Sequence, residues 1–331
     1  MKIAIGANLL IGDSGTLDMP VEVFAKWSES KIDGLVASLD KAQELGAEAF
    51  VILGGLFGDG FVPVGLMSEA LEELASHDVR ALYHPRCNEA GGADFLSLCG
   101  SSFKSVLPHR DDASAESPFI LGKGLSYGLM GEGDDPSAAL DDRKVAFAAS
   151  MDDDGVCVTA RCADGVCSFD LGNMEPQGFS DPYPSGFLLM SLDEGGQADA
   201  RWINRAEHPF VIRRVDVSGM ANLKEIIPVY TDAVCDIGTE SCVRVEFVGR
   251  APLNLSFNVR ELEQRLRKRF FYAEVTNESE VELGGFASDS AASLLAEFER
   301  VVLSDGELSD TEKARILRCG WGVLNGREIV E

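Results

Sequence analysis

Two stretches decide the fold, MKIAIGANLLIG at residues 1–12 and AEAFVILGGLFG at residues 47–58. Each begins with a run of apolar residues and ends in glycine, which is typical of a buried strand that leads into a turn. Between them, leucines at helical spacing predict a helix over residues 31–46. This order of strand, helix and strand predicts a parallel sheet covered by helices.

The pattern continues along the chain with a predicted helix over 64–78 and a strand over 79–84. After residue 100, short apolar stretches separated by acidic or glycine-rich turns predict a second, more antiparallel sheet. From residue 206 the pattern begins again with a strand, a helix, a strand and a basic helix, and two more helices follow. We therefore expect a first domain over 1–205, a small α+β domain over 206–276 and a helical C-terminal segment over 277–331.

The composition favours an acidic cytoplasmic protein. The 331 residues include 55 acidic and 29 basic side chains, which gives a net charge of −26. Such a surface repels nucleic-acid backbones, which proteins bind through Lys and Arg, so we expect weak or indirect contact with DNA. The sequence lacks the roughly 20-residue apolar run that a membrane helix needs, and its start does not resemble a leader. We therefore expect no membrane span and no secretion.

Eight cysteines are scattered through the chain, and we expect them to be reduced thiols. Three of them, Cys157, Cys162 and Cys167, are evenly spaced in the stretch CVTARCADGVC. The residues ADG predict a hairpin turn, with Cys157 and Cys167 on its flanking strands. Zinc sites generally use a tighter CxxC pair, so the sequence leaves the role of these thiols open.

Three short motifs resemble those of the calcineurin-like metallophosphoesterases, and in particular the SbcD-type (YhaO-like) DNA repair exonucleases. IGANLLIG at 5–12 aligns without a gap with the family's HTSDWHLG, GGLFG at 54–58 aligns with GDLFD, and RCNE at 86–89 aligns with GNHD. The motifs occur in the family's order and at family-like spacing. The likeness covers roughly residues 1–275 and rests on the framework, because the catalytic residues differ.

The resemblance implies a four-layer α/β/β/α metallophosphoesterase sandwich followed by a small α+β capping domain. It also implies hydrolysis of phosphodiesters by two metal ions, which clamp the phosphate and activate a water. In this chain, however, most ligand positions are changed. Asn8 replaces an aspartate and Leu10 a histidine in the first motif, and Gly55 replaces the bridging aspartate in the second. In the third, Cys87 replaces an asparagine, Asn88 the catalytic histidine and Glu89 an aspartate.

The last two family motifs are also degenerate. A histidine that closes a strand falls at Ala148, and the GHxH motif falls on ARCA, with Arg161 and Ala163 at the histidine positions. The chain has fewer histidines than a site of this family uses, and His84 alone lies near the aligned motifs. We therefore expect no metal cofactor, unless His84, Glu89 and acids such as Asp59 form an atypical manganese site. The four histidines are His77, His84, His109 and His208.

A basic segment, ELEQRLRKRFF, stands out from the acidic background. It is either an ordinary solvated helix face or a contact for DNA or an acidic partner. In the resembled family this region belongs to the capping domain that guides DNA, and the segment after it binds a coiled-coil ATPase of the SMC-like or SbcC-like kind. The family also commonly dimerises through helices, here 64–75. The basic residues are Arg260, Arg265, Arg267, Lys268 and Arg269.

Three functions compete. The first is a nuclease homologue that has lost its catalysis and acts as a scaffold or regulatory subunit of a DNA-processing complex. The second is an active metal-dependent exonuclease or phosphoesterase with an atypical or single-metal site. The third is an unrelated acidic binding protein with a similar order of strands. The number of changed ligand positions favours the first.

Overall fold

A computed structural model describes the chain in several stretches and divides it into two compact units, Met1–Pro209 and Phe210–Glu331. None of the described helices combines the length and the apolar character needed to cross a bilayer. The described residues are 1–13, 19–58, 62–84, 119–122, 125–130, 140, 145–152, 155–181, 184–220, 222–251, 259–281, 294–309, 312–313, 315–317 and 319–320.

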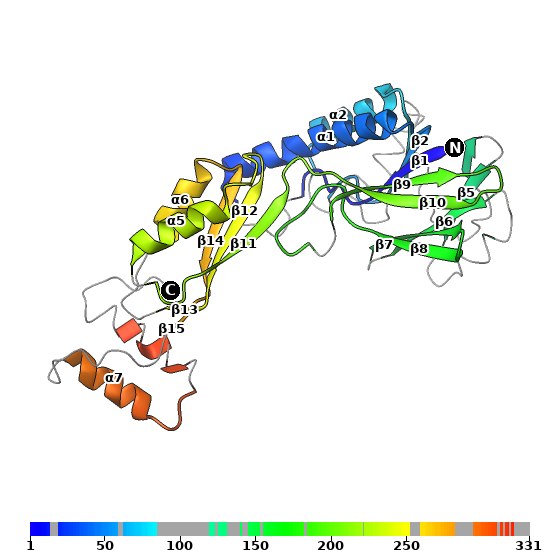
Figure 1. Cartoon of the computed structure of the whole chain (residues 1–331). Coiled ribbons are helices and arrows are strands. Elements are labelled where there is room, and N and C mark those ends of the chain that lie inside the picture. Colours follow the sequence, from blue (N-terminus) through cyan, green and yellow to red (C-terminus); the bar gives the residue numbers. More distant parts are fainter. Residues whose placement is uncertain are drawn as a thin grey trace. The chain divides into compact units, whose positions relative to one another are not determined.

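The first sheet of the N-terminal unit has the strand order β10-β9-β1-β2-β3 (Figure 1). The strands β1, β2 and β3 run parallel, as their sequence pattern predicts, whereas β9 pairs antiparallel with β1 and forms a hairpin with β10. The ends of the three parallel strands therefore meet at one edge of the sheet. The strands are β1 (Lys2–Gly6), β2 (Ala49–Leu53), β3 (Arg80–His84), β9 (Gly186–Leu192) and β10 (Ala198–Asn204).

Two helices, α1 (Val21–Glu44) and α2 (Val64–Ser76), cover one face of this sheet (Figure 1). Apolar side chains from α1 and α2 pack there against Ala4, Phe50 and Ile52. The helix predicted over 31–46 in fact begins at Val21, directly after Pro20, whose backbone is extended. The first turns of α1, before Trp27, bury no side chain, so no apolar pattern marks the start of the helix.

The second sheet packs against the opposite face of the first and has the order β4-β5-β6-β7-β8. Its neighbours are antiparallel except for β5 and β6. Alternate residues of β1 and β2, such as Ile5 and Val51, meet Phe147 and Val158 in the core between the sheets. The strands are β4 (Phe119–Gly122), β5 (Leu125–Met130), β6 (Val145–Asp152), β7 (Gly155–Cys162) and β8 (Gly165–Leu171).

The N-terminal unit is thus an α/β sandwich, as the sequence predicts. The described residues provide three layers, one of helices and two of sheet. A second helical layer is not found in the described part of the chain, so the four-layer form stays a prediction.

The C-terminal unit contains a parallel sheet with the order β11-β12-β14. Helices α5 and α6 contribute Ile226, Tyr230, Leu262 and Leu266 to a core on one face of that sheet. Further along the chain lie a short ladder and one more helix. The elements are β11 (Phe210–Asp216), α5 (Leu223–Ala233), β12 (Cys242–Val248), β13 (Arg250–Ala251), α6 (Val259–Arg267), β14 (Tyr272–Asn277), β15 (Glu280–Val281) and α7 (Leu294–Ser304).

Candidate functional site

The loops that follow β1 and β2 and the end of β3 are joined by backbone hydrogen bonds at one edge of the first sheet. The amide of Asn8 donates to the carbonyl oxygen of Gly54 at 3.2 Å, and the amide of Leu10 donates to that of Gly55 at 2.8 Å. The amide of Gly54 in turn donates to the carbonyl oxygen of His84 at 2.8 Å. The structure therefore brings together the chain positions that correspond to the first two motifs and the end of the third strand.

The backbone of this loop cluster is strained. Asn8 and Leu10 have φ angles of 55° and 54°, in the left-handed region that favours glycine. For a branched residue such as leucine this conformation costs roughly 1–2 kcal/mol, so other contacts must hold it. Such outliers concentrate at functional sites, which is a reason to treat this edge as the candidate site.

Gly55 approaches Asn8 so closely that a side chain at position 55 has no room. A Cβ on Gly55 would lie 2.6 Å from Asn8 Oδ1 and 2.9 Å from Asn8 Cα, and the φ of Gly55 is 63°. Asn8 Oδ1 is buried and has no hydrogen-bond partner among the described residues. Asn8 therefore occupies the space that a side chain at position 55 would need, and this is the position that aligns with the bridging carboxylate of the resembled family.

His84, the last residue of β3, is 1% exposed and hydrogen-bonded through Nε2 to the hydroxyl group of Tyr127 on β5. The two rings meet edge to face, and Tyr127 stacks on Phe147 at 4.8 Å. Burial lowers the pKa of His84 from 6.5 to about 4, so the imidazole is neutral at physiological pH. This contact links the two sheets and occupies the nitrogen atom that faces Tyr127.

We expect His84 to make the N-terminal unit sensitive to acid. Below pH 6.5 the unfolded chain takes up a proton that the folded chain accepts only near pH 4. Stability from the neutral imidazole is therefore complete above pH 6.5 and is lost as the pH falls, by about 3 kcal/mol between pH 6.5 and 4. Glu175, whose pKa is raised to about 7, contributes a slope of opposite sign over much of this range, so the difference between variants is the quantity to measure. In urea unfolding at several pH values, the stability of the wild type and of Tyr127→Phe should fall relative to that of His84→Gln as the pH decreases. An unchanged slope in His84→Gln would contradict the assignment.

Lys31 of α1 supports the strained loop. Its ammonium group donates to the carbonyl oxygen of Leu10 at 2.7 Å, to that of Asp13 at 3.4 Å and to Oε1 of Gln177 at 2.8 Å. It also lies 4.0 Å from the centre of the Trp27 ring. Burial lowers the pKa of Lys31 to about 7, opposed by nearby carboxylates. Three oxygen acceptors match the three donors of an ammonium group, so the geometry is that of the charged form.

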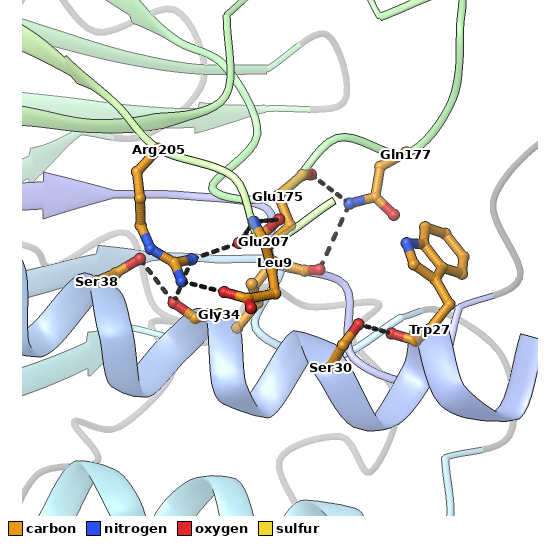
Figure 2. Close-up of polar contacts among 9 residues, drawn as sticks. All are labelled: Leu9, Trp27, Ser30, Gly34, Ser38, Glu175, Gln177, Arg205 and Glu207. Carbon is orange, nitrogen blue, oxygen red and sulfur yellow. Dashed lines mark hydrogen bonds and ion pairs between the residues drawn. The ribbon is translucent and has the colours of Figure 1, made fainter. Parts of the chain in front are cut away.

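Next to Lys31, a buried ion pair joins α1 to the connections that flank the β9–β10 hairpin (Figure 2). Arg205 Nη1 lies 2.5 Å from Glu175 Oε1 and donates to the carbonyl oxygen of Gly34 at 2.9 Å. The amide of Glu207 also donates to the Glu175 carboxylate. Glu175 is 3% exposed, and burial raises its pKa to about 7 against the opposing charge of Arg205. A Cβ on Gly34 would lie 2.6 Å from Glu175 Oε1, so glycine is required there.

Several residues of the predicted site lie outside the described stretches, namely Asp59, Cys87, Asn88, Glu89 and His109. Within the described residues, no group of three or more His, Cys, Asp or Glu side chains is placed to hold a metal ion. At the described motif positions, Asn8 offers an amide side chain, Leu10 offers an aliphatic one, and Gly55 has none. The described part of the site thus has the chemistry of a packed loop cluster.

The structure does not bring Ala148, Arg161 and Ala163 to this cluster. Ala148 is 1% exposed within β6, where it packs with Leu140 and Val145. Arg161 donates to the carbonyl oxygens of Leu140 and Val145. Ala163 lies in the exposed β7–β8 turn.

That turn lies near the beginning of β1, away from the loop cluster. Cys162, beside the turn, lies near enough to Asp199 for the charge of that carboxylate to help raise the pKa of its thiol. Asp199 pairs with Ser191, which in turn pairs with Lys2 at the start of β1. The structure therefore places Arg161 and Ala163 away from the loop cluster, and the role of the aligned positions stays a prediction.

The basic helix α6 uses much of its charge internally. Arg265 pairs with Glu261 at 2.7 Å and Arg267 with Glu263 at 2.8 Å, each one helical turn away. Arg269 donates to the carbonyl oxygens of Cys235 and Ile237. The two remaining residues, Arg260 and Lys268, are exposed. Two of the five basic side chains, Arg265 and Arg267, are therefore paired with carboxylates of α6 itself.

No role was predicted for Lys31, Glu175 and Gln177, which are buried, or for Arg205, which is half-buried. For Lys31 a signal existed, because it lies four residues after Trp27 and four before Leu35 on the buried face of α1. A lysine on an apolar helix face predicts either a snorkelling side chain or a buried partner. No such periodic signal marks Glu175, Gln177 or Arg205, which lie in connections between strands.

The chain matches no protein-family model and no curated protein.

Proposed function

We propose that this chain is an SbcD-like member of the metallophosphoesterase fold that has lost two-metal catalysis. It acts instead as a non-catalytic scaffold or regulatory subunit of a DNA-processing complex. The proposal rests on the sequence resemblance of residues 5–12 and 54–58. It is supported by the loops after β1 and β2, which meet as such a site requires but carry Asn8, Leu10 and Gly55.

One observation carries the proposal. The space at position 55 is taken by Asn8, because a Cβ on Gly55 would lie 2.6 Å from Asn8 Oδ1. At the same place the Lys31 ammonium group donates to the Leu10 carbonyl oxygen. A fixed cation of the chain thus lies beside the loop, and two-metal hydrolysis needs carboxylates and imidazoles there. We infer that the loop is held by the chain itself and needs no ion to keep its shape.

The test is a manganese titration by calorimetry, combined with a nuclease assay on the same sample. We expect no stoichiometric binding and no metal-dependent cleavage of single- or double-stranded DNA or of small phosphodiesters. Calcium and magnesium titrations control for general attraction of cations to an acidic surface. Binding of one or two manganese ions together with cleavage would overturn the proposal and favour the atypical active site. His84→Gln and Glu89→Gln would then show which residues hold the ion.

The partner is expected to be a coiled-coil ATPase of the SMC-like or SbcC-like kind, or a second copy of this chain. Direct contact with DNA is expected to be weak, because the net charge is −26 and the arginines of α6 are largely paired. Size-exclusion chromatography with light scattering distinguishes a homodimer from a monomer.

A further inference from the structure

A pocket opens between the two sheets of the N-terminal unit, on the side where β8 and β10 are the last described strands of their sheets (Figure 1). Its volume is about 380 Å³, within the range of roughly 300–1,000 Å³ that is usual for small-molecule sites. The pocket shares no lining residue with the loop cluster described above. Apart from one glycine, it is lined by Phe169, Asp170, Pro184, Leu188, Ala200 and Trp202.

Each sheet contributes one aromatic residue to the pocket. Phe169 of β8 and Trp202 of β10 pack from opposite sheets against the core between them. Trp202 pairs directly with Leu188 of β9, and Ala200 lies two residues before Trp202 on the same face of β10. Part of Trp202 is accessible, but its Nε1 atom is buried and has no hydrogen-bond partner among the described residues. A ligand in the pocket therefore meets Trp202 through atoms other than the N–H donor.

Asp170 of β8 supplies the one charge among the described residues that line the pocket. It is exposed, and in the strand ladder it lies opposite Cys157 of β7. The described lining includes no Lys or Arg to attract a carboxylate or a phosphate, and the net charge of the chain is −26. A cation with an apolar body therefore fits the pocket better than an anion does.

The supply of hydrogen-bond acceptors selects among cations. A primary ammonium group carries three N–H donors, and the side chains that line the pocket provide acceptors at Asp170 alone. A quaternary ammonium group has no donor to satisfy, and aromatic rings attract it through the cation–π interaction. We propose that this pocket binds a quaternary ammonium compound, with its methyl groups against Phe169 and Trp202 and its charge balanced by Asp170.

The test is a calorimetric titration of the full chain with choline chloride at constant ionic strength. The comparison ligand is the neutral carbon analogue of choline, in which a tert-butyl group replaces the trimethylammonium group. We expect saturable binding of choline at one site. The neutral analogue should bind about 5–30-fold more weakly, because it has the same shape but lacks the charge that aromatic rings attract.

Three variants assign the binding to this pocket. Trp202→Leu should weaken choline binding by about 5–30-fold, and Trp202→Phe should weaken it less because an aromatic ring remains. Asp170→Asn should weaken choline binding by about 2–5-fold, as expected for an exposed charge pair, and leave binding of the neutral analogue unchanged. Asp199→Asn is the matched control, because Asp199 is an exposed carboxylate of β10 that does not line the pocket. It should bind choline as the wild type does.

Circular dichroism of each variant shows whether the sandwich is folded, so that lost binding is not mistaken for lost structure. Equal affinity of the wild type for choline and for its neutral analogue would overturn the proposal, and so would the absence of saturable choline binding. A loss in Asp199→Asn as large as in Asp170→Asn would show general attraction of cations to an acidic surface, and would also overturn it. Because the loop cluster is not involved, these outcomes are independent of the manganese titration.

Discussion

Replacing Arg205 by methionine should lower the free energy of unfolding of the N-terminal unit by about 3–5 kcal/mol, the range for breaking a buried ion pair on one side. The change leaves the Glu175 carboxylate buried without its cation, and leaves the Gly34 carbonyl oxygen without the donor that Arg205 supplies. Urea unfolding followed by tryptophan fluorescence measures the loss. In a Trp321→Phe background the signal comes from Trp27 and Trp202, which both belong to the N-terminal unit.

Two further variants separate charge from packing. Glu175→Gln in the Arg205→Met background removes the stranded charge but keeps an oxygen acceptor for the Glu207 amide, so it should recover part of the loss. Lys41→Met breaks an exposed pair with Glu44 in the same unit and should cost under about 0.5 kcal/mol. If Arg205→Met and Lys41→Met are equally mild, the pair of Arg205 with Glu175 does not stabilise the unit.

Gly55→Asp should destabilise the N-terminal unit by about 2–5 kcal/mol without creating a manganese site. It reintroduces the carboxylate that the resembled family has at this position, but its Cβ meets Asn8 Oδ1 at 2.6 Å and Asn8 Cα at 2.9 Å. Overpacking of this kind costs about 1–3 kcal/mol, and a left-handed φ adds about 1–2 kcal/mol for a residue with a side chain. Urea unfolding gives the stability, and calorimetry with manganese gives the binding.

Gly46→Asp is the matched control for this variant. Gly46 has a φ of 79°, but a Cβ there meets nothing within 4 Å. It therefore carries the backbone cost without the clash, and should be milder than Gly55→Asp. Stoichiometric manganese binding by Gly55→Asp at unchanged stability would show that the loop cluster retains room for a metal site.

The local elements of the N-terminal sheet were predictable because their signals lie within a few residues of one another. Apolar runs that end in glycine mark β1 and β2, and helical spacing marks α2. The start of α1 was missed because its first turns bury few apolar side chains before Trp27. Asn8, Leu10 and Gly55, which belong to the first two motifs, lie in loops that the structure joins by hydrogen bonds.

The contacts that hold the candidate site were not predictable from local patterns. Lys31 finds Gln177 across 146 residues of sequence, and Arg205 finds Gly34 across 171 residues. A single sequence carries no periodic signal for such pairs. The location of Arg161 and Ala163 near the start of β1 was not predictable for a related reason, since the sequence does not show which end of the β7–β8 hairpin lies near the loops.

The long separation between Arg205 and Gly34 also bears on how the protein is made. At synthesis rates of roughly 5–20 residues per second, Arg205 leaves the ribosome roughly 10–30 seconds after Gly34. During that interval α1 has a lysine on its apolar face, and the segment that provides Gln177, Glu175 and Arg205 has not yet been made. The native contacts of α1, β1 and β2 are therefore incomplete until the β9–β10 hairpin has been synthesised. In a nascent chain halted before residue 175, α1 should remain accessible to proteases and chaperones.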